Sequence, residues 1–130
     1  MLPAVHVFQL YTTVGVVGVW WRFLSPNGRG LARGPHGFAT ADEASASLTQ
    51  MIRLLPDVAV VVRPTSDNRW RWRLDLGGSP LVLGAGAQDR RVRCEAAWRR
   101  FIDEAPEGLV DPVVHSFRGV DAGYPRRAIS

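Results

Sequence analysis

The chain has 130 residues, a hydrophobic fraction of 46% and one cysteine, so it is long enough for one domain with its own core. The single cysteine excludes an internal disulfide and a cysteine-rich zinc site. All 16 basic residues are arginine, and with 12 acidic residues they give a formal net charge of +4. This charge permits a polyanionic partner without requiring one.

The first 24 residues are apolar, yet they predict neither a signal peptide nor a membrane span. No positively charged segment precedes the apolar stretch, as a signal peptide requires. Gln9, Thr12 and Thr13 interrupt it, which is unfavourable in a membrane span. Its valines and aromatic residues favour β structure. We therefore expect a cytoplasmic protein without membrane contact.

Three strands followed by a helix are predicted in the first half of the chain. The strands fall within 8–33, and Asn27-Gly28 before the third strand is a strong hairpin signal. Thr40 and Glu43 have the spacing of a capping box, which predicts a helix that begins after Thr40. Apolar residues at helical spacing then give the helix one buried face, and Pro56 ends it.

The same order of elements is predicted again in the second half. Three β-prone runs lie within 60–84, and a helix is expected over 91–105. One face of this helix is apolar and includes Cys94, which we interpret as a small buried residue and not as a nucleophile. A last strand is predicted over 109–117, and the tail 119–130 is predicted to be flexible because it has no periodicity.

This pattern predicts an α+β fold in a single domain of residues 1–118. Two tandem β-β-β-α(-β) repeats, about 7–57 and 58–117, would form one antiparallel sheet. Both helices would then cover one face of the sheet, and the other face would stay open.

The first repeat resembles the YegP-like family of small proteins, and the second repeat resembles it in its strands. In place of Phe38, the second repeat has the stretch AQDRRV, and its Asn-Gly turn is replaced by Gly-Gly. The resemblance implies tandem units in which the last strand of each unit is exchanged onto the other. It implies no catalytic residues, so none are carried over. The resemblance rests on Trp21, Phe23, Asn27-Gly28, Leu31-Ala32, Phe38, Thr40, Ala44 and Leu48, and then on Trp70, Trp72, Leu74 and Leu81-Val82.

The stretch NRWRWRL, residues 68–74, contains the strongest candidate site. Because side chains alternate between the two faces of a strand, its tryptophans and its arginines are expected on opposite faces. The helices must cover the apolar face, so we expect Trp70, Trp72 and Leu74 in the core. The first repeat would add one aromatic residue and one arginine to the open face. The predicted binding face is Trp20, Arg22, Arg69, Arg71 and Arg73.

Two interpretations of this face remain open. Arginines beside an aromatic ring are typical of proteins that hold single-stranded nucleic acid. Alternatively, the face is only solvated, and the arginine stems cover apolar surface. We expect a non-enzymatic module that acts by surface binding in an accessory or regulatory role. The alternatives are weak nucleic-acid binding and a protein partner or homodimer, formed through a strand edge or Trp20. No catalytic, cofactor or metal residue is predicted.

Overall fold

The computed structural model describes residues 5–117, which form one sheet of seven strands and two α-helices. The predicted tail 119–130 lies outside the described residues. Each helix ends in a short 3₁₀ turn before the next strand begins. The elements are β1 (Val7–Thr13), β2 (Val16–Leu24), β3 (Gly30–Arg33), α1 (Ala41–Leu54), β4 (Ala59–Pro64), β5 (Trp70–Leu76), β6 (Ser79–Gly84), α2 (Arg91–Glu104) and β7 (Leu109–Phe117).

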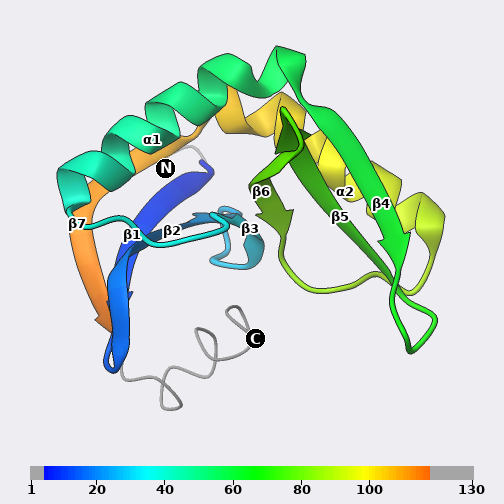
Figure 1. Ribbon diagram of the computed structural model, residues 1–130, viewed down its shortest axis with the longest axis horizontal. Coiled ribbons are helices and arrows are strands. Elements are labelled where there is room, and N and C mark those ends of the chain that lie inside the picture. The colour runs from blue at the N-terminus through cyan, green and yellow to red at the C-terminus, as the bar shows by residue number, and fades with distance from the viewer. Residues whose placement is uncertain (1–4, 118–130) are drawn as a thin grey trace.

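The two halves of the chain share one sheet with the strand order β4-β5-β6-β3-β2-β1-β7. Strands β3 and β6 join the halves at its centre. After α1 the chain adds β4 at one edge of the sheet, beside β5, and after α2 it adds β7 at the other edge, beside β1. Both helices lie on one side of the curved sheet (Figure 1). The predicted α+β fold with helices on one face is therefore confirmed.

One strand pair differs from the predicted antiparallel sheet. Strand β7 runs parallel to β1, whereas the other neighbouring strands are antiparallel. The sheet is therefore mixed. Parallel pairing requires a long crossover, and here the whole second half of the chain, including α2, separates β1 from β7. The alternation of side chains gives the face of a residue but not the direction of its strand.

Strand β7 is irregular at Asp111 and Pro112. Its pairing with β1 shifts register between Val110 and Val114. The Asp111 carboxylate accepts a hydrogen bond from the Val113 amide at 2.9 Å and lies 3.1 Å from a ring nitrogen of His115. These two hydrogen bonds, the first being the larger cause, hold the pKa of Asp111 below its ordinary value. The register shift of the edge strand thus coincides with these local hydrogen bonds.

The core is built around two tryptophans, each packed against a glycine. Trp21 and Trp72 are buried, and they lie against Gly34 and Gly84 respectively. A β-carbon on Gly34 would come within 2.6 Å of the Trp21 Nε1 atom, and one on Gly84 within 2.5 Å of the Trp72 Nε1 atom. Both halves therefore use the same tryptophan–glycine contact to hold the indole ring on the helix side.

The two helices begin differently. In α1 the Thr40 side chain accepts a hydrogen bond from the Glu43 amide at 3.1 Å, and the Glu43 carboxylate accepts one from the Ala39 amide at 3.2 Å. The predicted cap by Thr40 is therefore present, whereas Glu43 binds the amide before the N-cap and not the amide of Thr40 itself. In α2 Arg90 occupies the N-cap position and makes no side-chain cap hydrogen bond. Helix α2 therefore begins without the stabilisation that α1 has.

A first prediction concerns the tryptophan–glycine contact. Gly84→Ala should lower the free energy of unfolding by about 1–3 kcal/mol, because the added methyl group overpacks the site against Trp72. Urea unfolding followed by circular dichroism measures the loss. The control is the same change in a Trp72→Phe background, where the smaller ring leaves room for the methyl group. An equal loss in both backgrounds would contradict the packing explanation.

A second prediction concerns the helix starts. Thr40→Ala should lower the free energy of unfolding by about 1 kcal/mol, because the Glu43 amide loses its acceptor. Arg90→Thr should raise it by up to about 1 kcal/mol, because α2 gains a cap. Thr49→Ala, at an exposed position within α1, is the control. The changes in the free energy of unfolding must have opposite signs for the two cap variants. A lower free energy of unfolding for Arg90→Thr would contradict the prediction that α2 lacks a side-chain cap.

Candidate anion-binding site on the open sheet face

The alternating stretch of β5 takes the predicted orientation. Trp72 and Leu74 are buried in the core, whereas Arg71 is exposed. Trp70, at the start of the strand, is only half-buried and lies under the Arg91 guanidinium, with 5.4 Å between that group and the ring centre. The strand therefore presents its arginines to the open face, as predicted.

The register of the sheet brings further arginines to the same face. Residues directly opposite one another in neighbouring strands point to the same side. Arg22 of β2 lies opposite Arg33 of β3, which lies opposite Leu83 of β6, and Leu83 lies opposite Arg73 of β5. In the next row, Arg71 of β5 lies opposite Arg63 of β4. The open face thus collects side chains from five strands.

Four of these arginines line one pocket, which we call the arginine pocket. They are Arg33, Arg63, Arg71 and Arg73, and the pocket has a volume of about 260 Å³. Val61 and Leu83, which lie opposite Arg73 on its two sides, also line it. The result is a site in which apolar side chains lie beside four arginines.

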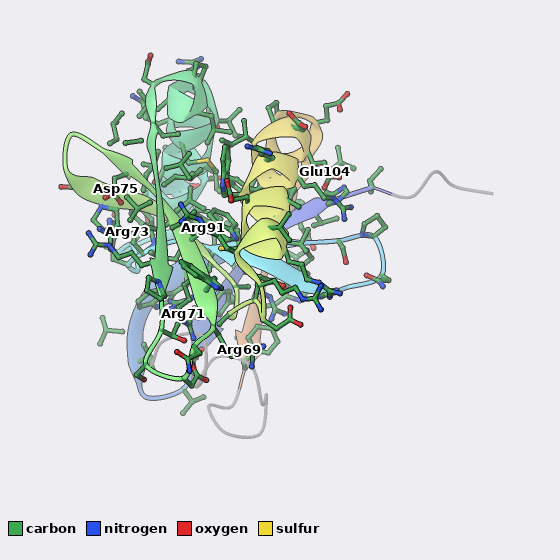
Figure 2. All side chains as sticks on the ribbon, turned by 90° about the vertical axis from the view of Figure 1, so that its right-hand side faces the viewer. Arg69, Arg71, Arg73, Asp75, Arg91 and Glu104 are labelled. Carbon is green, nitrogen blue, oxygen red and sulfur yellow. The ribbon has the colours of Figure 1, made fainter. Side chains whose placement is uncertain are left out.

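The Asp75 carboxylate binds one of the pocket arginines, Arg73, through its Nε atom. Arg73 Nε donates to Asp75 Oδ1 at 2.9 Å, and Asp75 is 8% exposed. The two side chains lie together on the side of the sheet away from α2 (Figure 2). The hydrogen bond from Arg73 to Asp75 uses the Nε atom, and Arg63 and Arg71 form no ion pair with a described residue. The pocket therefore carries an excess of positive charge.

Arg69 does not join the arginine pocket. It precedes β5, and its guanidinium donates to the Ala87 carbonyl at 2.9 Å. Nearby, the Thr65 hydroxyl donates to the Asp67 carboxylate. This hydrogen bond is the main cause that lowers the pKa of Asp67, with smaller contributions from the charges of Arg69 and Arg71. The Arg69 side chain thus links the end of the β4–β5 hairpin to the segment between β6 and α2.

Trp20 and Arg22 lie in the first half of the sheet and are engaged with neighbours there. The Arg22 guanidinium donates to Gln9 Oε1 at 2.7 Å and lies 4.7 Å from the centre of the Phe117 ring. Trp20 is half-buried against Gly37. A β-carbon added at Gly37 would come within 2.8 Å of the indole nitrogen of Trp20. Of the five predicted face residues, the structure therefore brings only Arg71 and Arg73 together in the pocket.

Sequence reasoning missed two members of the arginine pocket, Arg33 and Arg63. Arg33 was assigned to the third strand, but its partner across the sheet depends on the pairing of β3 with β6. Arg63 directly follows the apolar run 58–62. Strand β4 continues past the end of this run and includes Arg63 and Pro64. The run itself was the available signal: with Val61 pointing to the open face, Arg63 must point there too.

A second cavity, of about 350 Å³, lies on the helix side between α2 and the sheet. It is also lined by arginines, but two of them are paired. Arg93 lies 3.6 Å from Asp89, and Arg100 lies 3.4 Å from Glu104. The other oxygen of Glu104 lies 2.5 Å from His6 Nε2. Positive charge is therefore largely balanced in this cavity, in contrast to the arginine pocket.

The described residues show no assembled catalytic or metal centre. The three histidines have separate partners: His6 faces Glu104, His36 packs on Phe38 and His115 faces Asp111. Within residues 5–117 no group of three or more histidine, cysteine or acidic residues is placed to hold a metal ion. Cys94 is fully buried, and burial raises the pKa of its thiol, which disfavours the nucleophilic thiolate.

Neither α1 nor α2, the helices within the described part of the chain, is long and apolar enough to cross a membrane.

Comparisons with known proteins identify the fold. No family model and no curated protein matches the sequence. The solution NMR structure of yegP, a protein of unknown function from E. coli, is similar, with a TM-score of 0.67 and 8% identity over 89% of this chain and 97% of that one. UPF0339 protein SO3888 from Shewanella oneidensis is similar with a TM-score of 0.61 and 4% identity, over 86% and 89% of the two chains. The chain therefore has the YegP-like fold that its sequence motifs predicted.

Proposed function

We propose that this domain is a non-enzymatic binding module that holds the phosphate groups of single-stranded nucleic acid on its open sheet face. The observation that carries the proposal is the arginine pocket, which four arginines line and in which Arg63 and Arg71 form no ion pair with a described residue. Guanidinium groups bind phosphate oxygens in bidentate geometry, and each such contact is stronger than a neutral hydrogen bond.

The contacts available on this face favour the phosphate backbone over the bases. Base stacking needs an exposed aromatic ring beside the cationic groups. The described aromatic residues of the open face lie in its first half. Tyr11 is buried, Trp20 is half-buried against Gly37, and the half-buried Phe117 ring already lies against the Arg22 guanidinium. We therefore expect binding that tolerates different sequences and depends strongly on salt.

Self-association through a strand edge is less well supported. The edge strands β4 and β7 expose apolar side chains, including Val60 and Leu109. However, β4 ends in Arg63 and Pro64, and β7 contains Pro112 beside its irregular turn. Charged residues, prolines and local distortions are features by which proteins oppose the addition of a further strand.

A third prediction tests the proposed function. Arg71→Ala should weaken binding of a fluorescent single strand about tenfold at low salt, because one charge-assisted phosphate contact is lost. The plot of log affinity against log salt should also become shallower by about 0.7, the value for one contact on a single strand. Fluorescence anisotropy across a salt series measures both quantities.

The matched control is Arg53→Ala, which removes the same charge from an exposed position on α1. If it weakens binding as much as Arg71→Ala, the affinity reflects net charge and not the pocket. No binding by the unmodified protein at low salt would remove the proposal altogether.

A further inference from the structure

We infer that the cavity between α2 and the sheet, which Arg29 and Gln88 line, binds a small aromatic monocarboxylate. This site lies on the helix side of the sheet, so the inference does not depend on the function proposed for the open face. It follows from a difference between the two halves of the chain, from the apolar lining of the cavity and from the state of its charged groups.

Phe38 and Gln88 occupy matching positions in the two halves. Each lies shortly before a helix and exchanges two backbone hydrogen bonds, of 2.7 and 2.8 Å, with a residue of the sheet. The partner is Val19 in the first half and Trp70 in the second. The Phe38 side chain packs against the core, whereas Gln88 lines the cavity. The second half therefore has a polar side chain where the first half has a packed aromatic ring.

The apolar part of the cavity suits a single ring. The volume of about 350 Å³ is near the lower end of the range of about 300–1,000 Å³ that is usual for small-molecule sites. The rings of Trp72 and Phe101 are in contact, with 5.6 Å between their centres, and further aromatic rings pack well on such pairs. Two alanines of α2 leave room beside them. The apolar residues of the lining are Leu31, Trp72, Ala85, Ala96, Ala97 and Phe101.

The arginines of the lining differ in their partners. Arg93 lies 3.6 Å from Asp89, and Arg100 lies 3.4 Å from Glu104. Arg29 is exposed and forms no ion pair with a described residue. A guanidinium group binds a carboxylate through two parallel hydrogen bonds, so a ligand with one carboxylate would supply the partner that Arg29 lacks.

The lining favours an anion over a cation. Among its described residues the acidic one is Glu104, near the end of α2 (Figure 2). One oxygen of Glu104 lies beside Arg100, and the other lies 2.5 Å from His6 Nε2. The Gln88 amide, in contrast, makes no hydrogen bond with a described residue, and its two N–H groups remain available as donors. An ammonium group would thus find its acceptor already engaged, whereas a carboxylate would find donors.

The experiment titrates the nitrogen-labelled full chain with phenylacetate and follows the amide and indole signals by NMR. Saturable shifts are expected at Gln88, Ala96 and Ala97 and at the Trp72 indole. Phenylacetamide has the same ring without the charge and should bind about tenfold more weakly, because the charge-assisted hydrogen bond is lost. Acetate keeps the charge without the ring and should also bind at least about tenfold more weakly, because no ring surface is buried.

Three variants test the assignment to this cavity. Gln88→Phe, which introduces the residue of the matching position in the first half, should abolish binding of phenylacetate because its ring occupies the cavity. Arg29→Ala should weaken binding about tenfold. Arg53→Ala, which removes the same charge from an exposed position on α1, should leave binding unchanged. If circular dichroism melting shows that Gln88→Phe does not fold, Ala96→Leu narrows the cavity from an exposed position on α2 and must also weaken binding.

Each part of the inference can fail on its own. The absence of saturable shifts with phenylacetate would overturn it, as would unchanged binding by folded Gln88→Phe. Equal affinities for phenylacetate and phenylacetamide would overturn the assignment to a carboxylate. Binding of a single strand to the open face should be the same for Gln88→Phe and the unmodified chain, so failure of this site is distinguishable from failure of the proposed function.

Discussion

The contact between Trp72 and Gly84 is the constraint on which the rest of the open face depends. Only a residue without a β-carbon leaves room for the indole ring on the helix side of β6. Because Trp72 is fixed on that side, the residues before and after it must point to the other side. Trp21 and Gly34 make the equivalent contact in β2. One steric contact in each half therefore decides which residues of the strand meet the helices and which meet the solvent.

The open face that results is not uniform. In the first half, Arg22 is held by Gln9 and by the ring of Phe117, and Trp20 is packed on the Gly37 backbone. In the second half, Asp75 holds Arg73 at the margin of the pocket, and Arg63 and Arg71 form no ion pair with a described residue. A sheet tolerates several arginines close together because their long aliphatic stems lie along apolar neighbours while the guanidinium groups stay hydrated. The packing of the stems and the hydration of the guanidinium groups thus offset the repulsion between their positive charges.

The sequence predicted the layers and the faces of this fold but not its cross-strand partners. Alternation placed Trp72 and Arg71 correctly, because it depends only on local geometry. It could not place Arg69 correctly, because that residue lies before the strand and bonds to the Ala87 carbonyl. Arg33 was missed because its neighbours come from the pairing of β3 with β6, which joins distant parts of the chain. The parallel direction of β7 was missed for the same reason. Contacts of high sequence separation carry little local signal.

Arg63 has a second consequence through its position at the end of β4. The preceding residues 58–62 are uncharged, rich in valine and at the edge of the sheet, a composition typical of segments that aggregate as stacked strands. Arg63 and Pro64 follow this segment directly and act as gatekeepers against such stacking. A ligand that neutralised Arg63 would remove part of this protection. A ligand bound in the pocket would therefore also change the colloidal stability of the protein, through the Arg63 side chain.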